Sequence, residues 1–146
     1  IPIIPILQNV TVPPIPDQHR CYEIGQVIAD IIKDSFPDDV TVGLFATGGL
    51  SHEPGGLRDF WIDEEFDRHF LDLLDEGDHQ RVLEETTLDR LNEAGESGTG
   101  ELLSWIVAMG AIGERECTVH GYTAWDQWRC GIGAVSWDMT QTPSEL

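Results

Sequence analysis

Residues Val40 to Gly56, with the sequence VTVGLFATGGLSHEPGG, decide how the rest of the chain is interpreted. The first seven, Val40–Ala46, are apolar or small and favour extended structure. They predict a strand that is buried on both faces, as the strands of parallel sheets are. Glycines then allow a sharp turn and a close approach to a ligand, and His52 follows just past the strand's carboxyl end. Open α/β sheets bind ligands at that end, although a histidine on a surface loop is an equally good interpretation.

The segments before this stretch complete a predicted βαβ unit. Ile1–Val12 is apolar and β-prone, but its prolines remove donors from a strand ladder, which favours an edge strand or an irregular one. Asp17 is a good N-cap for a helix that continues to about Ser35 with apolar residues at helical spacing. Strand, helix and the Val40 strand then form a right-handed βαβ unit. The expected fold class is α/β, with a mixed or largely parallel sheet flanked by helices.

The segments after the glycine loop predict three more helices and two strands. The helices are expected over 63–76, 82–91 and 100–113, and the strands over 114–122 and 131–137. The second of these helices could be interrupted at Thr86, and Thr99 can cap the third. His69 and His79 are expected on the solvated surface. The tail from Thr140 to Leu146 is expected to fray.

Composition limits the kinds of partner and compartment. The 146 residues allow one domain, and 8 Lys and Arg against 27 Asp and Glu give a net charge of −19. Such a surface repels nucleic acid and anionic lipid, and no apolar run approaches the roughly 18 residues of a membrane span. The three cysteines have no metal-ligand spacing, so they are interpreted as core residues of a cytoplasmic protein.

Glu101 is the single acid at the start of a helix that is apolar almost all round. Burial of a carboxylate costs several kcal/mol unless a cation or hydrogen-bond donors compensate. Two interpretations follow from these residues. Glu101 is either a first-turn residue stabilised by helix amides or a metal ligand.

Four passages resemble the class III extradiol ring-cleavage dioxygenases, and among them the catalytic (beta) subunits of the protocatechuate 4,5-dioxygenase type. They are the proline-rich opening followed by RCYEIGQ, then FPDDVTVGLFATGGLSHE, GLRDFWIDEEFD and GTGELLSWIVAMGA. The resemblance extends from near residue 1 to about residue 137 and weakens after Gly113. Because the chain starts at Ile1 and not at Met, we expect residues 1–146 to be the carboxyl-terminal half of one catalytic α/β domain.

The resemblance implies an activity and roles for particular residues. The family uses O₂ to cleave a catecholic ring beside its two hydroxyls, with Fe(II) held by two histidines and one carboxylate. By motif match, Glu101 is the carboxylate ligand and His52 is an acid/base residue near the metal. Histidine side chains titrate near neutral pH, which suits proton transfer from and to the diol. The implied substrate is a catecholic aromatic acid, in an aromatic-compound catabolic reaction.

One departure from the family pattern concerns the metal site. The family's two histidine ligands lie in an amino-terminal half that has no counterpart here, so this chain supplies one ligand of three. It is expected to be inactive alone. It is therefore interpreted as part of a full enzyme, with that half as partner, or as a relic without activity. A small accessory subunit and a homo- or hetero-oligomer are further expectations.

Arg129 is the candidate substrate-binding residue. It is one of only eight cations, lies between two apolar stretches and falls near the region that lines the family's substrate pocket. A guanidinium can hold a carboxylate through two hydrogen bonds. An ordinary ion pair with Asp126 or Asp138 is an equally good interpretation.

Two other function classes are compatible with the sequence. One is a metal-free structural or regulatory subunit of the same fold. The other is a zinc hydrolase in which His52 and Glu101 are ligands of the same ion. Metal content and oxygen consumption separate these classes from the dioxygenase.

Overall fold

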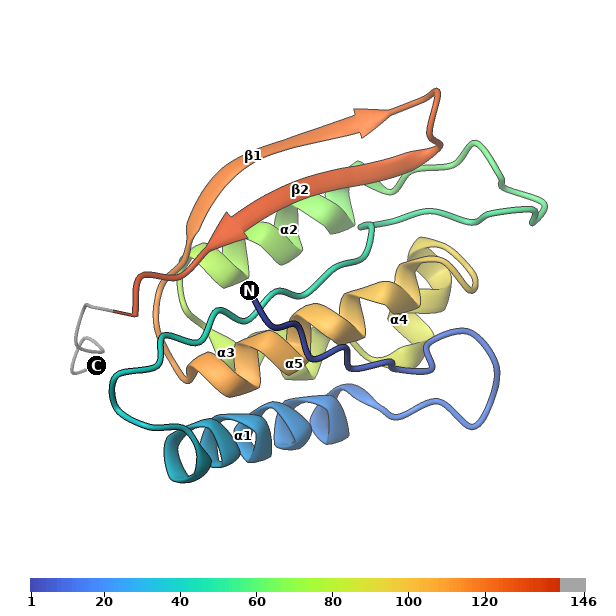
Figure 1. Cartoon of the computed structure of the whole chain (residues 1–146). Helices are drawn as coiled ribbons and strands as arrows, with labels where there is room; N and C mark the ends of the chain where they lie inside the picture. The colour runs from blue at the N-terminus through green and yellow to red at the C-terminus, as the bar shows by residue number, and fades with distance from the viewer. Residues whose placement is uncertain (140–146) are drawn as a thin grey trace.

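The computed structural model describes residues 1–139, and the expected fraying of residues 140–146 lies outside them (Figure 1). A layer of helices packs beneath a long two-stranded antiparallel hairpin. None of the described helices is both long and apolar enough to cross a membrane. The elements, in chain order, are α1 (Gln18–Ser35), α2 (Glu64–Asp75), α3 (His79–Glu85), α4 (Leu88–Ala94), the 3₁₀ turn η1 (Thr99–Glu101), α5 (Leu102–Ile112), β1 (Thr118–Trp125) and β2 (Cys130–Ser136).

Local capping signals set the helix boundaries as predicted. Asp17 caps α1 by accepting a hydrogen bond from the Arg20 N–H, and Asp63 caps α2 in the same way. Gly77, with φ of 71°, follows the end of α2. The predicted interruption at Thr86 is real, because α3 ends before it and α4 begins after it.

Helix α5 is the centre of the core. It is buried over most of its length and packs along α1, where Gly25 and Gly110 bring the two backbones close together. A Cβ atom on Gly25 would lie 2.1 Å from the Val107 carbonyl oxygen, so this packing requires glycine at position 25. The prediction of a helix apolar on nearly all faces is confirmed, and this helix carries Glu101 at its N-cap position.

The predicted parallel sheet is wrong for the described residues. The α/β character is confirmed, but the sheet consists of β1 and β2 alone and is antiparallel. Ile1–Val12 and Val40–Ala46 form no strand, so the predicted βαβ unit is absent from residues 1–139. The physical reason is that β-prone residues form a ladder only beside a partner strand. Without one, the apolar side chains stay exposed, as Phe45 is at 89%.

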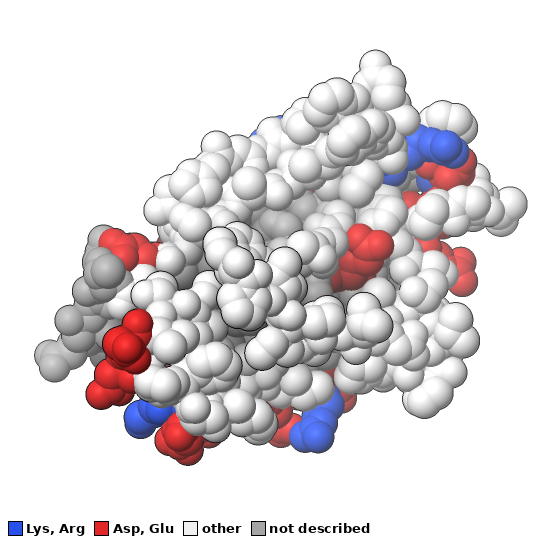
Figure 2. All heavy atoms as spheres, viewed as in Figure 1, with Lys and Arg blue, Asp and Glu red and all other residues white. Residues whose placement is uncertain are grey.

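These two extended segments give one side of the molecule an unusual surface. Their exposed large apolar residues are Ile1, Ile3, Ile4, Ile6, Leu7, Val12, Val40, Val42, Leu44 and Phe45. Viewed from that side, the surface is mostly uncharged, and most acidic and basic groups lie near its rim (Figure 2). For a chain with a net charge of −19, a face so poor in charge is notable.

Two histidines on the helical side differ from each other. His69 is exposed, as predicted, and pairs with Glu85. The prediction for His79 is wrong, because this residue is only 2% exposed and its Nδ1 is 3.1 Å from the Tyr22 hydroxyl. Apolar packing at the first turn of α3 buries it, and burial lowers the pKa of His79 to about 4.

We expect acid to destabilise the chain through His79. The folded pKa of about 4 lies below the ordinary value of 6.5, so the unfolded state binds more protons between these pH values. Stability is therefore full above pH 6.5 and falls by up to about 3 kcal/mol as the pH drops to about 4. Urea unfolding at several pH values should show that the free energy of unfolding falls less with acid in His79→Gln than in the parent. The control His69→Gln, at an exposed site, should lose as much stability with acid as the parent. Equal losses of stability in all three proteins would show that His79 is not the cause.

Candidate functional site

The glycine loop approaches the start of α5 closely enough to bind its carboxylate. Gly48 has φ of 154°, and a Cβ atom there would lie 2.8 Å from the Glu101 Cβ. This contact leaves room for the Gly49 N–H to donate to Glu101 Oε2 over 2.7 Å. The Glu101 side chain makes no capping hydrogen bond to its own helix. The interpretation of Glu101 as a residue stabilised by helix amides is therefore wrong, because its donor comes from the loop.

Two side chains of α5 donate hydrogen bonds to the backbone of the same loop. Ser104 Oγ donates to the Thr47 carbonyl over 2.7 Å, and Trp105 Nε1 donates to the Gly48 carbonyl over 3.2 Å. The loop and the helix N-terminus thus form one rigid unit. Sequence analysis did not identify either contact, because both join residues far apart in the chain.

His52 faces Glu101 across a short gap. Its Nε2 lies 3.9 Å from Glu101 Oε1, and its Nδ1 lies 2.7 Å from the Leu50 carbonyl oxygen. A carbonyl can only accept, so the neutral ring carries its proton on Nδ1 and leaves a lone pair on Nε2. The His52 side chain is 14% exposed and that of Glu101 is 42% exposed. The two residues predicted from sequence therefore lie together, with a basic nitrogen directed toward a carboxylate.

Thr99 ties the backbone of His52 to η1. The His52 N–H donates to Thr99 Oγ1 over 3.2 Å. Gly95 and Gly98 pack against the His52 carbonyl oxygen, and a Cβ atom on either would lie 2.3 Å from it. The prediction that Thr99 caps the helix is wrong, because no side chain caps η1 or α5. The run of small residues between α4 and α5 was the only sequence signal for this packing.

Cys130 forms the wall of the site on the hairpin side. Its Sγ would lie 2.4 Å from a Cβ atom on Gly49, next to the His52 ring. Burial first, and then the negative charge of Glu101, raise the pKa of Cys130 to about 11, so the thiol is neutral. Cys21 and Cys117 are buried in the core as predicted, and all three cysteines are free thiols.

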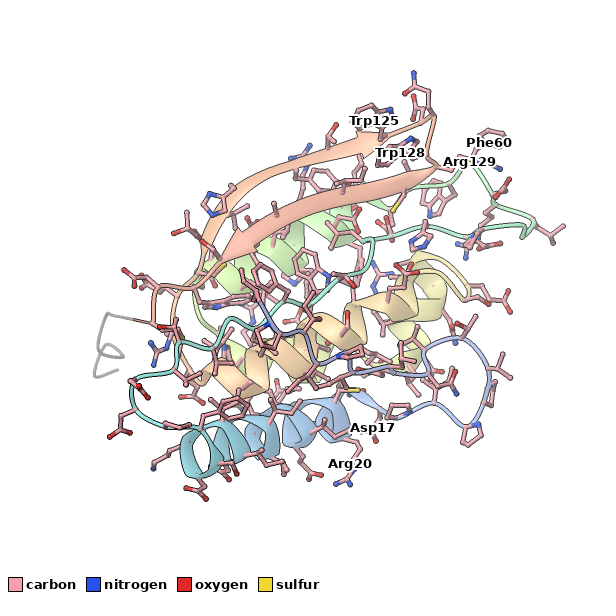
Figure 3. All side chains as sticks on the ribbon, viewed as in Figure 1. Asp17, Arg20, Phe60, Trp125, Trp128 and Arg129 are labelled. Carbon is pink, nitrogen blue, oxygen red and sulfur yellow. The ribbon has the colours of Figure 1, made fainter. Side chains whose placement is uncertain are left out.

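Arg129 lies at the turn of the hairpin, one residue from this wall. It has φ of 55°, pairs with Asp59 and lies over the Phe60 ring at 5.2 Å from the centroid. Figure 3 shows it near the stacked rings of Trp125 and Trp128, whose centroids are 5.2 Å apart. The ion-pair interpretation is confirmed, with Asp59 of the loop after His52 as a partner that sequence analysis did not name.

Comparison with known proteins decides the family. A family model described as the catalytic LigB subunit of aromatic ring-opening dioxygenase matches residues 1–131. This chain belongs to that family. The prediction of class III extradiol dioxygenase membership is confirmed at this level.

Curated relatives of this LigB chain carry dioxygenase names. A gallate dioxygenase of Pseudomonas putida is 37% identical over 112 residues, which cover 77% of this chain and 32% of that protein. A 2,3-dihydroxyphenylpropionate/2,3-dihydroxicinnamic acid 1,2-dioxygenase of Dechloromonas aromatica is 24% identical over 181 residues, with 92% and 57% covered. One of Burkholderia vietnamiensis is 23% identical over 180 residues, with 92% and 56% covered. The chain thus spans about a third to somewhat over half of these relatives' lengths.

The Glu101 carboxylate at this site has the orientation of a metal ligand. One oxygen of Glu101 is fixed by the Gly49 N–H, which leaves the other oxygen with lone pairs directed toward His52 and solvent. A carboxylate oriented in this way fits a metal ligand. Within residues 1–139, no group of three or more His, Cys, Asp or Glu side chains is placed to hold a metal ion. Among residues 1–139, Glu101 is therefore not accompanied by the further ligands that a metal ion needs.

Proposed function

We propose that this chain is the carboxyl-terminal part of the catalytic α/β domain of a class III extradiol dioxygenase. It takes part in cleaving a catecholic aromatic acid with O₂ at a mononuclear non-haem Fe(II) centre. The observation that carries the proposal is the pair of His52 Nε2 and Glu101 Oε1, which face each other at 3.9 Å. The family match and relatives named for gallate and 2,3-dihydroxyphenylpropionate support the reaction class.

Glu101 is the proposed carboxylate ligand. Ferrous iron in this coordination supplies sites at which a diol and O₂ can be activated together. Glu101 contributes a carboxylate of restricted orientation, because the Gly49 N–H donates to its Oε2 over 2.7 Å. The apolar helix behind it, with Leu102 and Leu103 fully buried, keeps water away from one side of the site.

His52 is the proposed acid/base residue. The Leu50 carbonyl retains the proton on Nδ1, so Nε2 is free to take a proton from a substrate hydroxyl and to return it as the ring opens. Its backbone is held on both sides, by Thr99 through the N–H and by the packed glycines at the carbonyl. The ring is therefore preorganised for proton transfer at Nε2, which lowers the cost of reaching the reactive arrangement.

The remaining ligands are proposed to come from an amino-terminal half that carries two histidines. The uncharged face formed by Ile1–Leu7 and Val40–Phe45 supports this arrangement (Figure 2). Both segments are extended, and within residues 1–139 no backbone hydrogen bond joins residues 1–7 or 41–46 to a strand. Added strands would pair with them and cover their apolar side chains. We also propose that the full enzyme has a small accessory subunit, forms a homo- or hetero-oligomer and is located in the cytoplasm.

Metal analysis and oxygen uptake test the proposal. The natural polypeptide or complex that contains this chain should hold iron and consume O₂ with protocatechuate, gallate or 2,3-dihydroxyphenylpropionate. A ring-opened product should appear in step with oxygen loss. Iron-free protein with no oxygen uptake would favour a structural or regulatory subunit, whereas bound zinc without oxygen uptake would favour a hydrolase.

Arg129 is the proposed contact for the substrate carboxylate. Its guanidinium has five donors, so the ion pair with Asp59 leaves others for a second carboxylate. We expect Arg129→Gln to raise KM for a catecholic acid about tenfold, with a smaller change in kcat. Steady-state kinetics with unsubstituted catechol provide the control, because that compound has no carboxylate to lose. An equal rise in KM for both compounds would contradict this role.

A further inference from the structure

A buried carboxylate lies behind the loop that carries His52. Asp67 on α2 has no exposed surface. Its Oδ1 accepts from the Ser51 N–H at 2.8 Å, and its Oδ2 accepts from the Ser51 hydroxyl at 2.9 Å and from the Tyr122 hydroxyl at 2.8 Å. Burial raises the pKa of Asp67, and the hydrogen bonds from Ser51 and Tyr122 act against this rise. The carboxylate is thus satisfied by donors from the loop and from strand β1.

Two further hydrogen bonds hold Ser51, and a third holds its neighbour Leu50. Its hydroxyl accepts from the Asp63 N–H at 2.8 Å, and its carbonyl accepts from the Gly131 N–H at 3.0 Å. The Gly131 carbonyl in turn accepts from the Leu50 N–H at 2.9 Å. A Cβ atom on Gly131 would lie 2.0 Å from Asp67 Oδ2, so the absence of a side chain there makes room for the carboxylate. Helix α2, the hairpin and the glycine loop therefore meet at Asp67.

The orientation of His52 depends on the two residues that this cluster holds. Ser51 precedes His52, and the Leu50 carbonyl is the acceptor for His52 Nδ1. A shift of the Leu50–Ser51 backbone would change where the ring points and which nitrogen carries the proton. We propose that Asp67 is a positioning residue for His52, because its buried carboxylate fixes the Leu50–Ser51 backbone and so directs His52 Nε2 toward Glu101.

The proposal has one part that rests on the proposed function and one that does not. Its effect on turnover requires the dioxygenase reaction. Its effect on the ring of His52 is a property of the chain itself. The two parts can therefore fail separately.

The test compares Asp67→Asn with the parent in the natural assembly that contains this chain. Asparagine keeps the shape but replaces one acceptor oxygen with a donor NH₂, which disturbs the bonds from Ser51 or from Tyr122. Nitrogen-15 NMR of the His52 ring should show a single Nδ1–H tautomer in the parent and a mixture in the variant. We expect kcat to fall ten- to a hundredfold, while KM and the iron content change by about twofold at most.

Two further variants keep the test decisive. Ser51→Ala removes the hydroxyl that donates to Asp67 and accepts from the Asp63 N–H, so it loosens the same backbone and should give a tautomer mixture even where Asp67→Asn folds poorly. Thr86→Ala removes a buried hydroxyl that donates to the Val82 carbonyl in the turn between α3 and α4, and it is the control for general destabilisation. It should leave both the His52 spectrum and kcat unchanged.

Particular outcomes would overturn the inference. An unchanged His52 spectrum in both Asp67→Asn and Ser51→Ala would exclude a positioning role. If Thr86→Ala loses as much kcat as Asp67→Asn, the loss would reflect general destabilisation and not the positioning of His52. Absence of oxygen uptake in the parent would defeat the proposed function, while the NMR comparison would still decide whether Asp67 positions His52.

Discussion

Replacing Glu101 by alanine should abolish iron retention and, with it, ring cleavage. Glu101 is the only proposed metal ligand in this chain, and its Oε1 is the oxygen that lies 3.9 Å from His52 Nε2. Loss of a ligand should cost more affinity than the roughly 10- to 100-fold that follows loss of a residue behind one. The measurement is the iron-to-protein ratio of the purified assembly after gel filtration, together with O₂ uptake in the presence of added Fe(II).

A matched variant separates this effect from the loss of charge. Glu93 on α4 is also acidic, and its side chain is 72% exposed. Glu93→Ala removes one negative charge as Glu101→Ala does, but it should keep iron and activity. Thermal unfolding should be recorded for both, because Glu101→Ala also deprives the Gly49 N–H of its acceptor. Full iron content in folded Glu101→Ala would show that the ligand assignment is wrong.

Replacing His52 by phenylalanine should leave iron bound and slow turnover by about 10²- to 10⁴-fold. The phenyl ring occupies similar space within the packing of Gly49, Gly98 and Cys130, but it has no nitrogen with which to accept a proton. Iron content and stability should therefore change little, and kcat should carry most of the loss. Stopped-flow measurement of the ring-opened product, with metal analysis of the same sample, tests both expectations together.

The control for this variant is another histidine on the surface. His69 on α2 is exposed and pairs with Glu85 of α3. His69→Phe should retain parental kcat and iron content. Full activity in His52→Phe would remove the acid/base role, whereas loss of iron in that variant would indicate that His52 is itself a ligand.

Features that depend on neighbouring residues were predictable from the sequence. The start of α1 at Asp17, the start of α2 at Asp63 and the stop at Gly77 all follow from side chains or backbone angles within one helical turn. The break at Thr86 was also visible as a local interruption. The family resemblance of two separate passages pointed to His52 and Glu101, although it gave no distance between them.

Features that depend on distant partners were not predictable in this way. Val40–Ala46 has the composition of a buried strand, yet it is extended and exposed because no strand pairs with it among residues 1–139. The sequence predicted His79 on the surface, whereas in the structure α1 packs against it and the Tyr22 hydroxyl lies 3.1 Å from its Nδ1. Arg129 pairs with Asp59 because the loop after His52 folds back to the hairpin turn.

The sequence by itself determined where most helices lie, the caps of α1 and α2, the family and the residues most suited to chemistry. Only the tertiary structure decided that His52 and Glu101 face each other, that Nε2 is the free nitrogen of the ring and that Asp67 supports the loop from behind. The reason is the range of the forces involved. Caps and helical periodicity act within a few residues, whereas these contacts exist only after long-range packing has brought α2, the glycine loop, α5 and the hairpin together.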